Sequence, residues 1–315
     1  NFPKPMSCSS SVFYFPAMRK FKKIVVVDET KMNTSTLEEL NKYANEVEVY
    51  HDEPTSEEVK SRVEDAEAII VSWRTQISEE IIDAAKDLKY IGMACSLYDD
   101  ESANVAVNYA QERNIEVNGI FDYGDPGVIE FVISEVIQLL HGFGEHQWQE
   151  QPLELSGQKF GIIGLGTTGK LLAKALEALN VEVYYFSRTR KPEFENAKLK
   201  YLELGELLKT CDIISIHLPK NTVLLKENEF KQFGDNKVLI NTSLGLPFEE
   251  KSFQNWLKVR NNYTIFDGDA TAYLPESIIN RENVIASQKS AGWSQQTQER
   301  LSFKVLQNIQ NFLER

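Results

Sequence analysis

A glycine-rich hexamer between an apolar strand and an amphipathic helix restricts the possible folds of this chain more than any other segment. Residues 159–163 have the nearly continuous apolar pattern of a buried parallel strand. Residues 167–180 place leucines and alanines on one helical face, and residues 181–186 are β-branched or aromatic, as is typical of a second strand. The pattern predicts a βαβ unit with a phosphate-binding turn, whose residues are Gly164, Leu165, Gly166, Thr167, Thr168 and Gly169.

The three glycines have separate roles in such a turn. Gly164 permits the tight turn, Gly166 lets the backbone approach a pyrophosphate, and Gly169 allows the helix to pack closely on the strand. A phosphate bound there meets unpaired N–H groups and the positive end of the helix dipole. A glycine turn without a ligand is the alternative, and the strand–turn–helix context favours a cofactor site.

The residues that end the second strand distinguish NADP(H) from NAD(H). NAD sites place an Asp or Glu about 20 residues beyond the glycines, where it binds the ribose hydroxyls. Here a serine stands at that point, and hydroxyl and guanidinium groups donate to a 2′-phosphate instead of repelling it. An ordinary solvated basic turn is the main alternative for Arg190 and Lys191. The sequence predicts a preference for NADP(H), bound by Ser187, Arg188, Thr189 and Arg190.

Composition and charge limit the classes of protein to which this chain can belong. The 315 residues suffice for two domains, and 42% hydrophobic with 26% charged residues does not suggest disorder. A net charge of −13 argues against a nucleic-acid surface. Three distant cysteines form neither a disulfide framework nor a CxxC pair, which predicts a cytoplasmic location. The four histidines lack metal-ligand spacing, so we expect no metal, and no apolar run approaches the roughly 20 residues that span a bilayer.

The first residues differ in character from the rest of the chain. Residues 1–17 contain three prolines and a serine cluster, without the basic start and apolar stretch of a secretory signal. We expect an irregular extension or an expression remnant there, with Met18 as the natural start.

Strands and helices alternate along the remaining sequence. One helix is expected over residues 102–113. The segment 119–127, which contains Pro126, has the composition of a joint, and a long apolar helix follows from Val128 to about His141. The alternation predicts an α/β fold with two doubly wound parallel-sheet domains.

We predict a substrate domain over residues 18–123 plus 294–315 and a dinucleotide-binding domain over residues 124–293. Only the second domain carries the phosphate-binding turn. Ligands of such sheets lie at the carboxyl ends of the strands, so the reacting site is expected in the cleft between the domains.

Several short segments carry a family resemblance. They are residues 87–92, 98–99, 103–105, 114–117, 155–158, 211–219 and 239–242, together with the glycine hexamer. In these segments the chain resembles the D-isomer-specific 2-hydroxyacid dehydrogenases, from Met18 nearly to its end. The resemblance implies a flavodoxin-like first domain that binds a small-molecule substrate, a Rossmann second domain that binds the cofactor, and a terminal helix that crosses back onto the first domain. It also implies a homodimer, for which the apolar helix over residues 128–140 is suited.

The same resemblance assigns further residues to the cofactor. One strand end borders the adenosine, and two others border the nicotinamide. The adenosine-side residues are His217, Leu218 and Pro219, and the nicotinamide-side residues are Thr242, Ser243, Leu244 and Asp267.

Three catalytic side chains of that family are missing at their expected positions. The family uses an Arg that binds the substrate carboxylate, a Glu that holds a His, and that His as the proton carrier. The corresponding positions are Leu244, Ala272 (in a loose alignment) and Lys289. Leu244 cannot pair with a carboxylate, whereas Lys289 can donate a proton to a developing alkoxide. A solvated loop lysine is an equal alternative for Lys289.

Other polar residues follow strands near the expected site. Arg74 ends a strand of the first domain, where it can supply the missing anionic anchor. Tyr98 and Asp99 lie in the loop that holds substrate in the family, and Asp269 and Tyr273 follow Asp267. Each of these is individually better explained as structural than as catalytic.

Three functions are compatible with this pattern. The leading hypothesis is an NADP(H)-dependent oxidoreductase that transfers a hydride to a small carbonyl or imine, with Lys289 as the proton donor and Arg74 and Tyr98 as further catalytic candidates. The second is an inactive NADP(H)-binding sensor or scaffold. The third is a 2-hydroxyacid dehydrogenase with relocated groups, for instance Arg74 in place of the lost Arg.

Overall fold

The structure is a computed structural model, and it describes residues 19–98, 100, 103–220 and 222–315. The predicted extension over residues 1–17 lies outside the described residues, as do Cys8 and Asp99.

The chain divides into two compact units. Unit 1 runs up to Ile120 and includes Ser302–Arg315, and unit 2 is Phe121–Leu301. The predicted boundaries fall a few residues later at the first junction, between 123 and 124, and earlier at the second, between 293 and 294. The second junction lies inside a helix, α12 (Gln295–Leu313).

Unit 1 is built on a five-stranded sheet in which all neighbouring strands are parallel. The strand order β2-β1-β3-β4-β5 is that of flavodoxin-like sheets, as the sequence predicts. The strands are β1 (Phe21–Val26), β2 (Ala44–Val49), β3 (Ala68–Val71), β4 (Tyr90–Met93) and β5 (Glu116–Asn118).

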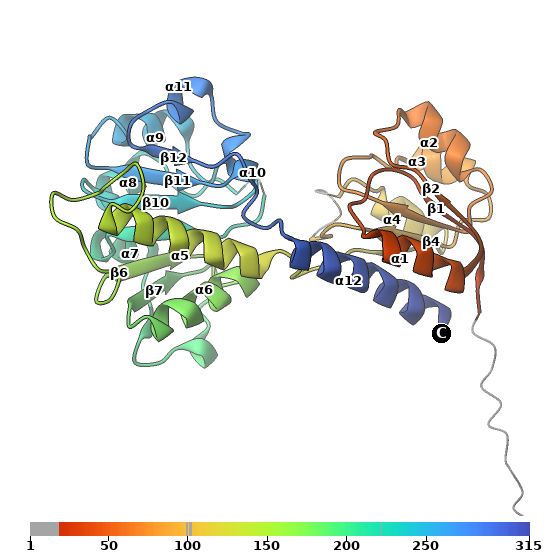
Figure 1. Cartoon of the computed structure of the whole chain (residues 1–315), viewed down its shortest axis with the longest axis horizontal. Coiled ribbons are helices and arrows are strands. Elements are labelled where there is room, and N and C mark those ends of the chain that lie inside the picture. Colours follow the sequence, from red (N-terminus) through yellow and green to blue (C-terminus); the bar gives the residue numbers. More distant parts are fainter. Residues whose placement is uncertain (1–18, 99, 101–102, 221) are drawn as a thin grey trace, which may run out of the picture. The chain divides into compact units, whose positions relative to one another are not determined.

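Helices cover both faces of this sheet (Figure 1). On one face, α12 contributes Phe312, whose ring centroid lies 5.4 Å from that of Phe21 and 5.1 Å from that of Tyr90. Asn308 of the same helix donates to the carbonyl of Gly119 at 3.0 Å. The other helices of unit 1 are α1 (Thr34–Glu39), η1 (Leu40–Lys42), α2 (Ser56–Val63), α3 (Glu79–Ala84) and α4 (Val107–Glu112).

Unit 2 contains a seven-stranded parallel sheet. Its order, β12-β11-β10-β9-β6-β7-β8, is the Rossmann order with one further strand, which confirms the predicted fold class. The order reverses between β6 and β9, and the glycine hexamer directly follows β6. The strands are β6 (Lys159–Ile163), β7 (Glu182–Phe186), β8 (Leu199–Tyr201), β9 (Ile213–Ile216), β10 (Val238–Asn241), β11 (Tyr263–Phe266) and β12 (Val284–Ala286).

Two apolar cores lie on opposite faces of the unit 2 sheet, as the layers in Figure 1 illustrate. The first contains Val132 of α5 and Leu172 of α6, and the second contains Leu207 of α7 and Phe253 of α9. The helices are α5 (Asp125–His141), α6 (Thr167–Ala178), η2 (Pro192–Phe194), α7 (Leu204–Thr210), α8 (Glu227–Phe233), α9 (Glu250–Trp256), α10 (Gly268–Thr271) and α11 (Glu276–Ile279).

Two predicted helix starts were wrong. α5 begins at Asp125, inside the predicted joint, because Pro126 occupies the first turn, where a missing N–H has no helical partner to lose. α4 begins at Val107, later than the predicted residue 102, because Val105 forms a parallel bridge with Ile77.

Candidate functional site

The glycine hexamer forms a turn that two of its glycines make possible. Gly164 has a φ of +100°, and a Cβ added there would lie 2.1 Å from the carbonyl oxygen of His217. A Cβ added to Gly169 would lie 2.1 Å from the carbonyl oxygen of Gly164. These two positions are therefore required by the fold itself, since any side chain collides with backbone.

Gly166 differs from its two neighbours because nothing in the fold requires it. A Cβ added there meets no described atom within 4 Å, and its φ is −78°. Gly166 is also the N-cap of α6, so no side chain covers the unpaired N–H groups of the first turn. The open space above Gly166 and the positive end of α6 together fit a pyrophosphate.

The loop after β7 presents its polar groups unequally. Ser187 lies at the predicted position, and its hydroxyl donates to the carbonyl of Thr189 at 2.6 Å. Arg190 makes two hydrogen bonds of 2.7 Å to Glu195, so its guanidinium is engaged. Arg188 is exposed and has no hydrogen bond or ion pair with any other described residue. Of the two arginines, Arg188 is the one available to a phosphate.

For a third cation of this loop, Lys191, the sequence offers an ordinary solvated turn as the main alternative to phosphate binding. The ammonium of Lys191 donates to the carbonyl of Leu165 in the glycine turn at 2.7 Å. The basic run over residues 188–191 is the only sequence signal for this contact. The run does not tell which of its cations faces the turn.

The adenosine-side and nicotinamide-side segments meet within unit 2. The backbone N–H of Leu218 donates to the hydroxyl of Ser243 at 3.0 Å, and that hydroxyl donates to the carbonyl of Ile216 at 3.2 Å. The His217 ring lies 3.0 Å from the Ser215 hydroxyl. Burial lowers the pKa of His217 to about 4, so its ring is neutral at physiological pH.

Because of His217, the free energy of unfolding should decrease as the pH is lowered. Its folded-state pKa, about 4, lies below the ordinary value near 6.5, so the unfolded chain binds the extra proton between these values. Between pH 7.5 and 4.5 we expect wild type to lose roughly 2 kcal/mol more unfolding free energy than His217→Gln. Urea unfolding followed by the fluorescence of Trp148 and Trp256, both buried in unit 2, measures the difference. Equal losses of unfolding free energy in wild type and His217→Gln would contradict a lowered pKa of His217.

Asp267 joins the ends of β11 and β12. It is 2% exposed, and its carboxylate accepts the N–H groups of Ala270 at 3.1 Å and Ala291 at 2.9 Å. Burial raises its pKa although both amides act in the opposite direction. Alongside it, the Gly268 N–H donates to the carbonyl of Lys289 at 2.9 Å. Asp267 thus fixes the loop that carries the proposed proton donor.

The three positions that the resemblance assigns to missing family side chains follow three neighbouring strands, β10, β11 and β12. Leu244 is 48% exposed, and Ala272 and Lys289 are also exposed. The Lys289 ammonium has no hydrogen bond or ion pair with the rest of the described chain. Among the described residues, this edge of the unit 2 sheet offers an apolar side chain and an unpaired cation at the positions where the resemblance leads one to expect Arg and His.

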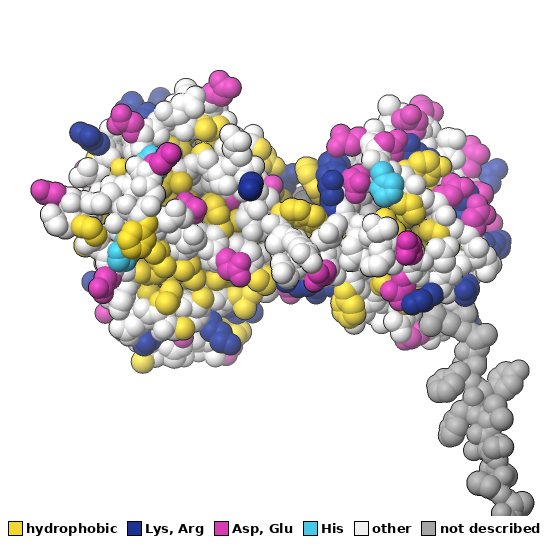
Figure 2. Space-filling view, viewed as in Figure 1, with side chains coloured by type: hydrophobic (Ala, Val, Ile, Leu, Met, Phe, Trp, Pro, Cys, Tyr) yellow, Lys and Arg dark blue, Asp and Glu magenta, His cyan; other side chains and the backbone are white. Residues whose placement is uncertain are grey.

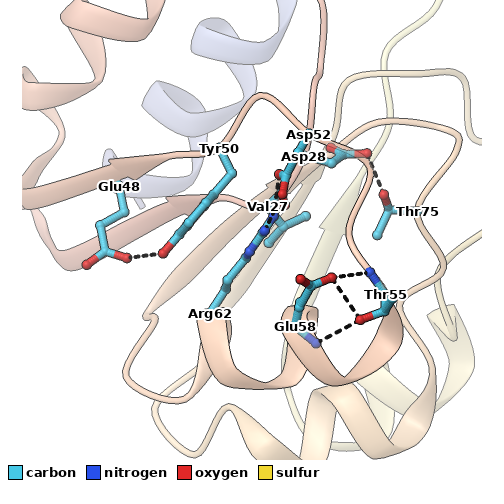
Figure 3. A network of polar contacts seen from close by, with 9 residues as sticks. All are labelled: Val27, Asp28, Glu48, Tyr50, Asp52, Thr55, Glu58, Arg62 and Thr75. Atoms are coloured by element: carbon cyan, nitrogen blue, oxygen red, sulfur yellow. Dashed lines mark hydrogen bonds and ion pairs between the residues drawn. The ribbon is translucent and has the colours of Figure 1, made fainter.

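Arg74 and Tyr98 belong to unit 1. Asp28, 1% exposed, accepts the hydroxyl of Thr75 at 2.6 Å and the N–H of Ser72 at 2.9 Å, which shapes the turn that carries Arg74 (Figure 3). Arg74 donates to the carbonyl of Glu29 at 2.6 Å. Tyr98 is 71% exposed.

A second cation of unit 1, Arg62, which the sequence does not single out, uses its guanidinium in contacts within the unit. Arg62 pairs with Asp52 through hydrogen bonds of 2.7 and 2.6 Å, donates to the carbonyl of Val27 at 2.8 Å, and lies 4.0 Å from the centre of the Tyr50 ring (Figure 3). Arg74 has fewer polar partners among the described residues. Besides the Glu29 carbonyl, Glu53 lies 3.4 Å from its Nε, and its guanidinium lies 5.7 Å from the centre of the Trp73 ring. Arg74 is therefore the more available of these two cations.

Metal and thiol chemistry receive no support from the described part of the chain. It contains no group of three or more His, Cys, Asp or Glu side chains arranged to hold a metal ion. Cys95 and Cys211 are buried free thiols, and burial raises the pKa of each to about 12, so both are unreactive. No helix among the described residues has the length and apolarity to cross a membrane.

The parallel seven-stranded sheet and the glycine turn at its reversal define a protein with a Rossmann dinucleotide-binding domain. Residues 132–287 match the family model of the D-isomer specific 2-hydroxyacid dehydrogenase, NAD binding domain. The chain belongs to the D-isomer-specific 2-hydroxyacid dehydrogenase family.

Three known proteins illustrate the similarity. A hydroxypyruvate reductase of Blautia hydrogenotrophica is 29% identical over 208 residues, which span 60% of this chain and 63% of that protein. An acyclic imino acid reductase (Bsp5), solved in complex with NADPH and D-Arg, is 26% identical with a TM-score of 0.78 over 93% of this chain and 97% of its own. D-2-hydroxyisocaproate dehydrogenase is 17% identical and shares the fold, with a TM-score of 0.77 over 92% and 96% of the two chains.

Proposed function

We propose that this protein is an NADP(H)-dependent oxidoreductase that transfers a hydride to a small carbonyl or imine compound. One observation carries the proposal: a serine and an unpaired arginine, Ser187 and Arg188, end the strand beside an open glycine turn. No carboxylate stands at the Ser187 position to repel a 2′-phosphate. The similarity to an imino acid reductase solved with NADPH supports both the cofactor and the imine substrate.

The residues that hold the cofactor have distinct tasks. The first turn of α6 binds the pyrophosphate through backbone N–H groups, and Gly166 leaves the space for it. Ser187 and Arg188 donate to the 2′-phosphate. The segments 217–219 and 242–244, joined through Ser243, support the adenosine and nicotinamide sides. NADPH, when bound, supplies the hydride.

Lys289 is the proposed proton donor to the substrate oxygen or nitrogen. Its backbone is held from both sides, because its carbonyl accepts the Gly268 N–H at 2.9 Å and its N–H donates to the Ser287 hydroxyl at 3.0 Å. The ammonium itself is unpaired among the described residues, so it can reach a ligand. Leu244 leaves no cation on the neighbouring strand end for a substrate carboxylate.

A cofactor titration followed by a substrate panel tests the proposal. We expect NADPH to bind at least about 10-fold more tightly than NADH, measured by the fluorescence of the reduced nicotinamide. The preferred cofactor is then offered with 2-oxo acids, aldehydes and mixtures of oxo acids with amines that form imines. Tighter binding of NADH would refute the cofactor assignment.

Replacement of Lys289 by methionine tests the proton donor. We expect kcat for the best substrate to fall by about 100-fold or more, as is usual on loss of a general acid, while the Kd of NADPH stays unchanged. Lys251→Met, which removes another exposed lysine on α9, is the matched control and should retain full activity. Unchanged turnover in Lys289→Met would remove Lys289 from the mechanism.

Two other functions have separate signatures in the same experiments. An NADP(H) sensor is favoured by the loss of all three family side chains at Leu244, Ala272 and Lys289, and it requires tight NADPH binding without turnover of any substrate. A 2-hydroxyacid dehydrogenase with relocated groups requires reduction of glyoxylate or hydroxypyruvate that Arg74→Ala abolishes.

An isologous homodimer through α5 is also part of the proposal. An apolar band crosses unit 2 over α5 and α6 in Figure 2. The exposed side chains of Phe143, Leu171 and Leu179 lie just after α5, in α6 and just after α6, and Phe131 and Ile137 of α5 are only partly buried. Exposed apolar surface of this kind supports a protein partner, and the family resemblance favours a second copy of the chain.

A further inference from the structure

The loop between β7 and β8 folds back over the start of α6. Lys191 reaches the glycine turn, where its ammonium lies 2.7 Å from the carbonyl oxygen of Leu165. Three residues later, the ring centre of Phe194 lies 4.7 Å from the ammonium of Lys170 in the first turns of α6. These two contacts place the loop beside the turn that the pyrophosphate is proposed to occupy.

A buried tyrosine holds the loop in this position. Tyr185 is fully buried in β7, and its hydroxyl donates to Glu195 at 2.9 Å and accepts the backbone N–H of Lys191 at 2.8 Å. Glu195 in turn makes two hydrogen bonds of 2.7 Å with Arg190. The backbone at Lys191 is therefore tied to a rigid strand, and its side chain direction follows from that tie.

The charges of the loop are unequally compensated. Glu195 offsets the charge of Arg190, whereas the Lys191 ammonium contacts only a neutral carbonyl. Glu193, the other carboxylate of the loop, is exposed and forms no ion pair with any residue that the structure describes. The Lys191 ammonium thus has no carboxylate partner among the described residues, and it lies near the positive end of the α6 dipole, where a cation is unfavourable unless an anion binds nearby.

We infer that Lys191 is a second cationic ligand for the 2′-phosphate of NADP(H), next to Arg188, and that Arg190 is held away from the cofactor by Glu195. The inference rests on the proposed NADP(H) site and adds a residue to it. The 2′-phosphate is chosen over the pyrophosphate because the loop continues from the end of the second strand, where the adenosine ribose lies in this fold. The pyrophosphate is met by the N–H groups of α6 instead.

Titration of Lys191→Met with NADPH and NADH tests the inference. We expect the Kd of NADPH to rise by about 10- to 30-fold and that of NADH by less than about twofold, because only NADPH carries the phosphate. NADH binding also reports that the variant is folded. Lys191→Arg, which keeps the charge, should retain most of the preference, and Lys200→Met on the exposed face of β8 should behave as wild type with both cofactors.

The other outcomes overturn the inference or the site beneath it. Equal weakening of both cofactors would move Lys191 to the pyrophosphate and contradict the assignment. Unchanged binding of both would make the lysine a structural tie to Leu165 only. If wild type itself binds NADH more tightly than NADPH, the proposed NADP(H) site fails, independently of any Lys191 variant.

Discussion

A Gly166→Ala variant is expected to fold like the wild type and to bind both NADPH and NADH at least about 30-fold more weakly. The fold tolerates the change because the added methyl meets no described atom within 4 Å and the backbone already has a negative φ. The same methyl occupies the open space above the turn, where a pyrophosphate must approach the backbone. Thermal unfolding and cofactor titration on one sample separate the two effects.

Gly164→Ala is the matched control with the opposite expectation. Its Cβ would lie 2.1 Å from the carbonyl oxygen of His217, and its φ is +100°, so the variant should lose stability by roughly 3 kcal/mol or more. Wild-type cofactor affinity in Gly166→Ala would show that no dinucleotide uses this turn. A large loss of stability in Gly166→Ala would show that the apparent space is occupied.

Replacing Ser187 by aspartate should reverse the cofactor preference. A carboxylate at the end of β7 repels the 2′-phosphate and accepts hydrogen bonds from the ribose hydroxyls of NADH. We expect NADPH binding to weaken by about 100-fold, or about 2.7 kcal/mol, and NADH binding to hold or improve. Titration with both cofactors measures the ratio directly.

Ser187→Asn separates charge from shape in this experiment. Asparagine has nearly the size of aspartate and also loses the serine hydroxyl that donates to the Thr189 carbonyl. Its NADPH affinity should fall by much less than that of the aspartate variant. If both variants bind NADPH equally, repulsion at this position does not decide the preference.

Much of the fold could be predicted because its signals are local. The strand, turn and helix over residues 159–180 follow from apolar periodicity and glycine spacing within one short window, and β6 has the predicted bounds. The start of α4 could not be predicted in this way. It depends on the bridge between Val105 and Ile77, which are far apart in the sequence.

The candidate site likewise has features that the sequence predicts and features that only the tertiary structure shows. The sequence has a serine and a basic run at the end of β7, and the family resemblance implies that Leu244 and Lys289 stand in place of an Arg and a His. It does not show that Lys289 has a free ammonium on a fixed backbone, because the fixing contacts come from Gly268 and Ser287.

The sequence by itself determines which residues carry the chemistry and which strand, turn and helix present them. Short stretches of the chain suffice for this, because periodicity and glycine geometry act over a few residues. The choice among neighbouring cations belongs to tertiary structure. Lys191 meets a carbonyl 26 positions away in the glycine turn, while Arg190 is taken by Glu195. Similarly, the Asp267 carboxylate accepts the N–H of Ala291, 24 positions away, and so fixes the loop that carries Lys289. Contacts over such separations depend on how strands and loops pack, which no local pattern encodes.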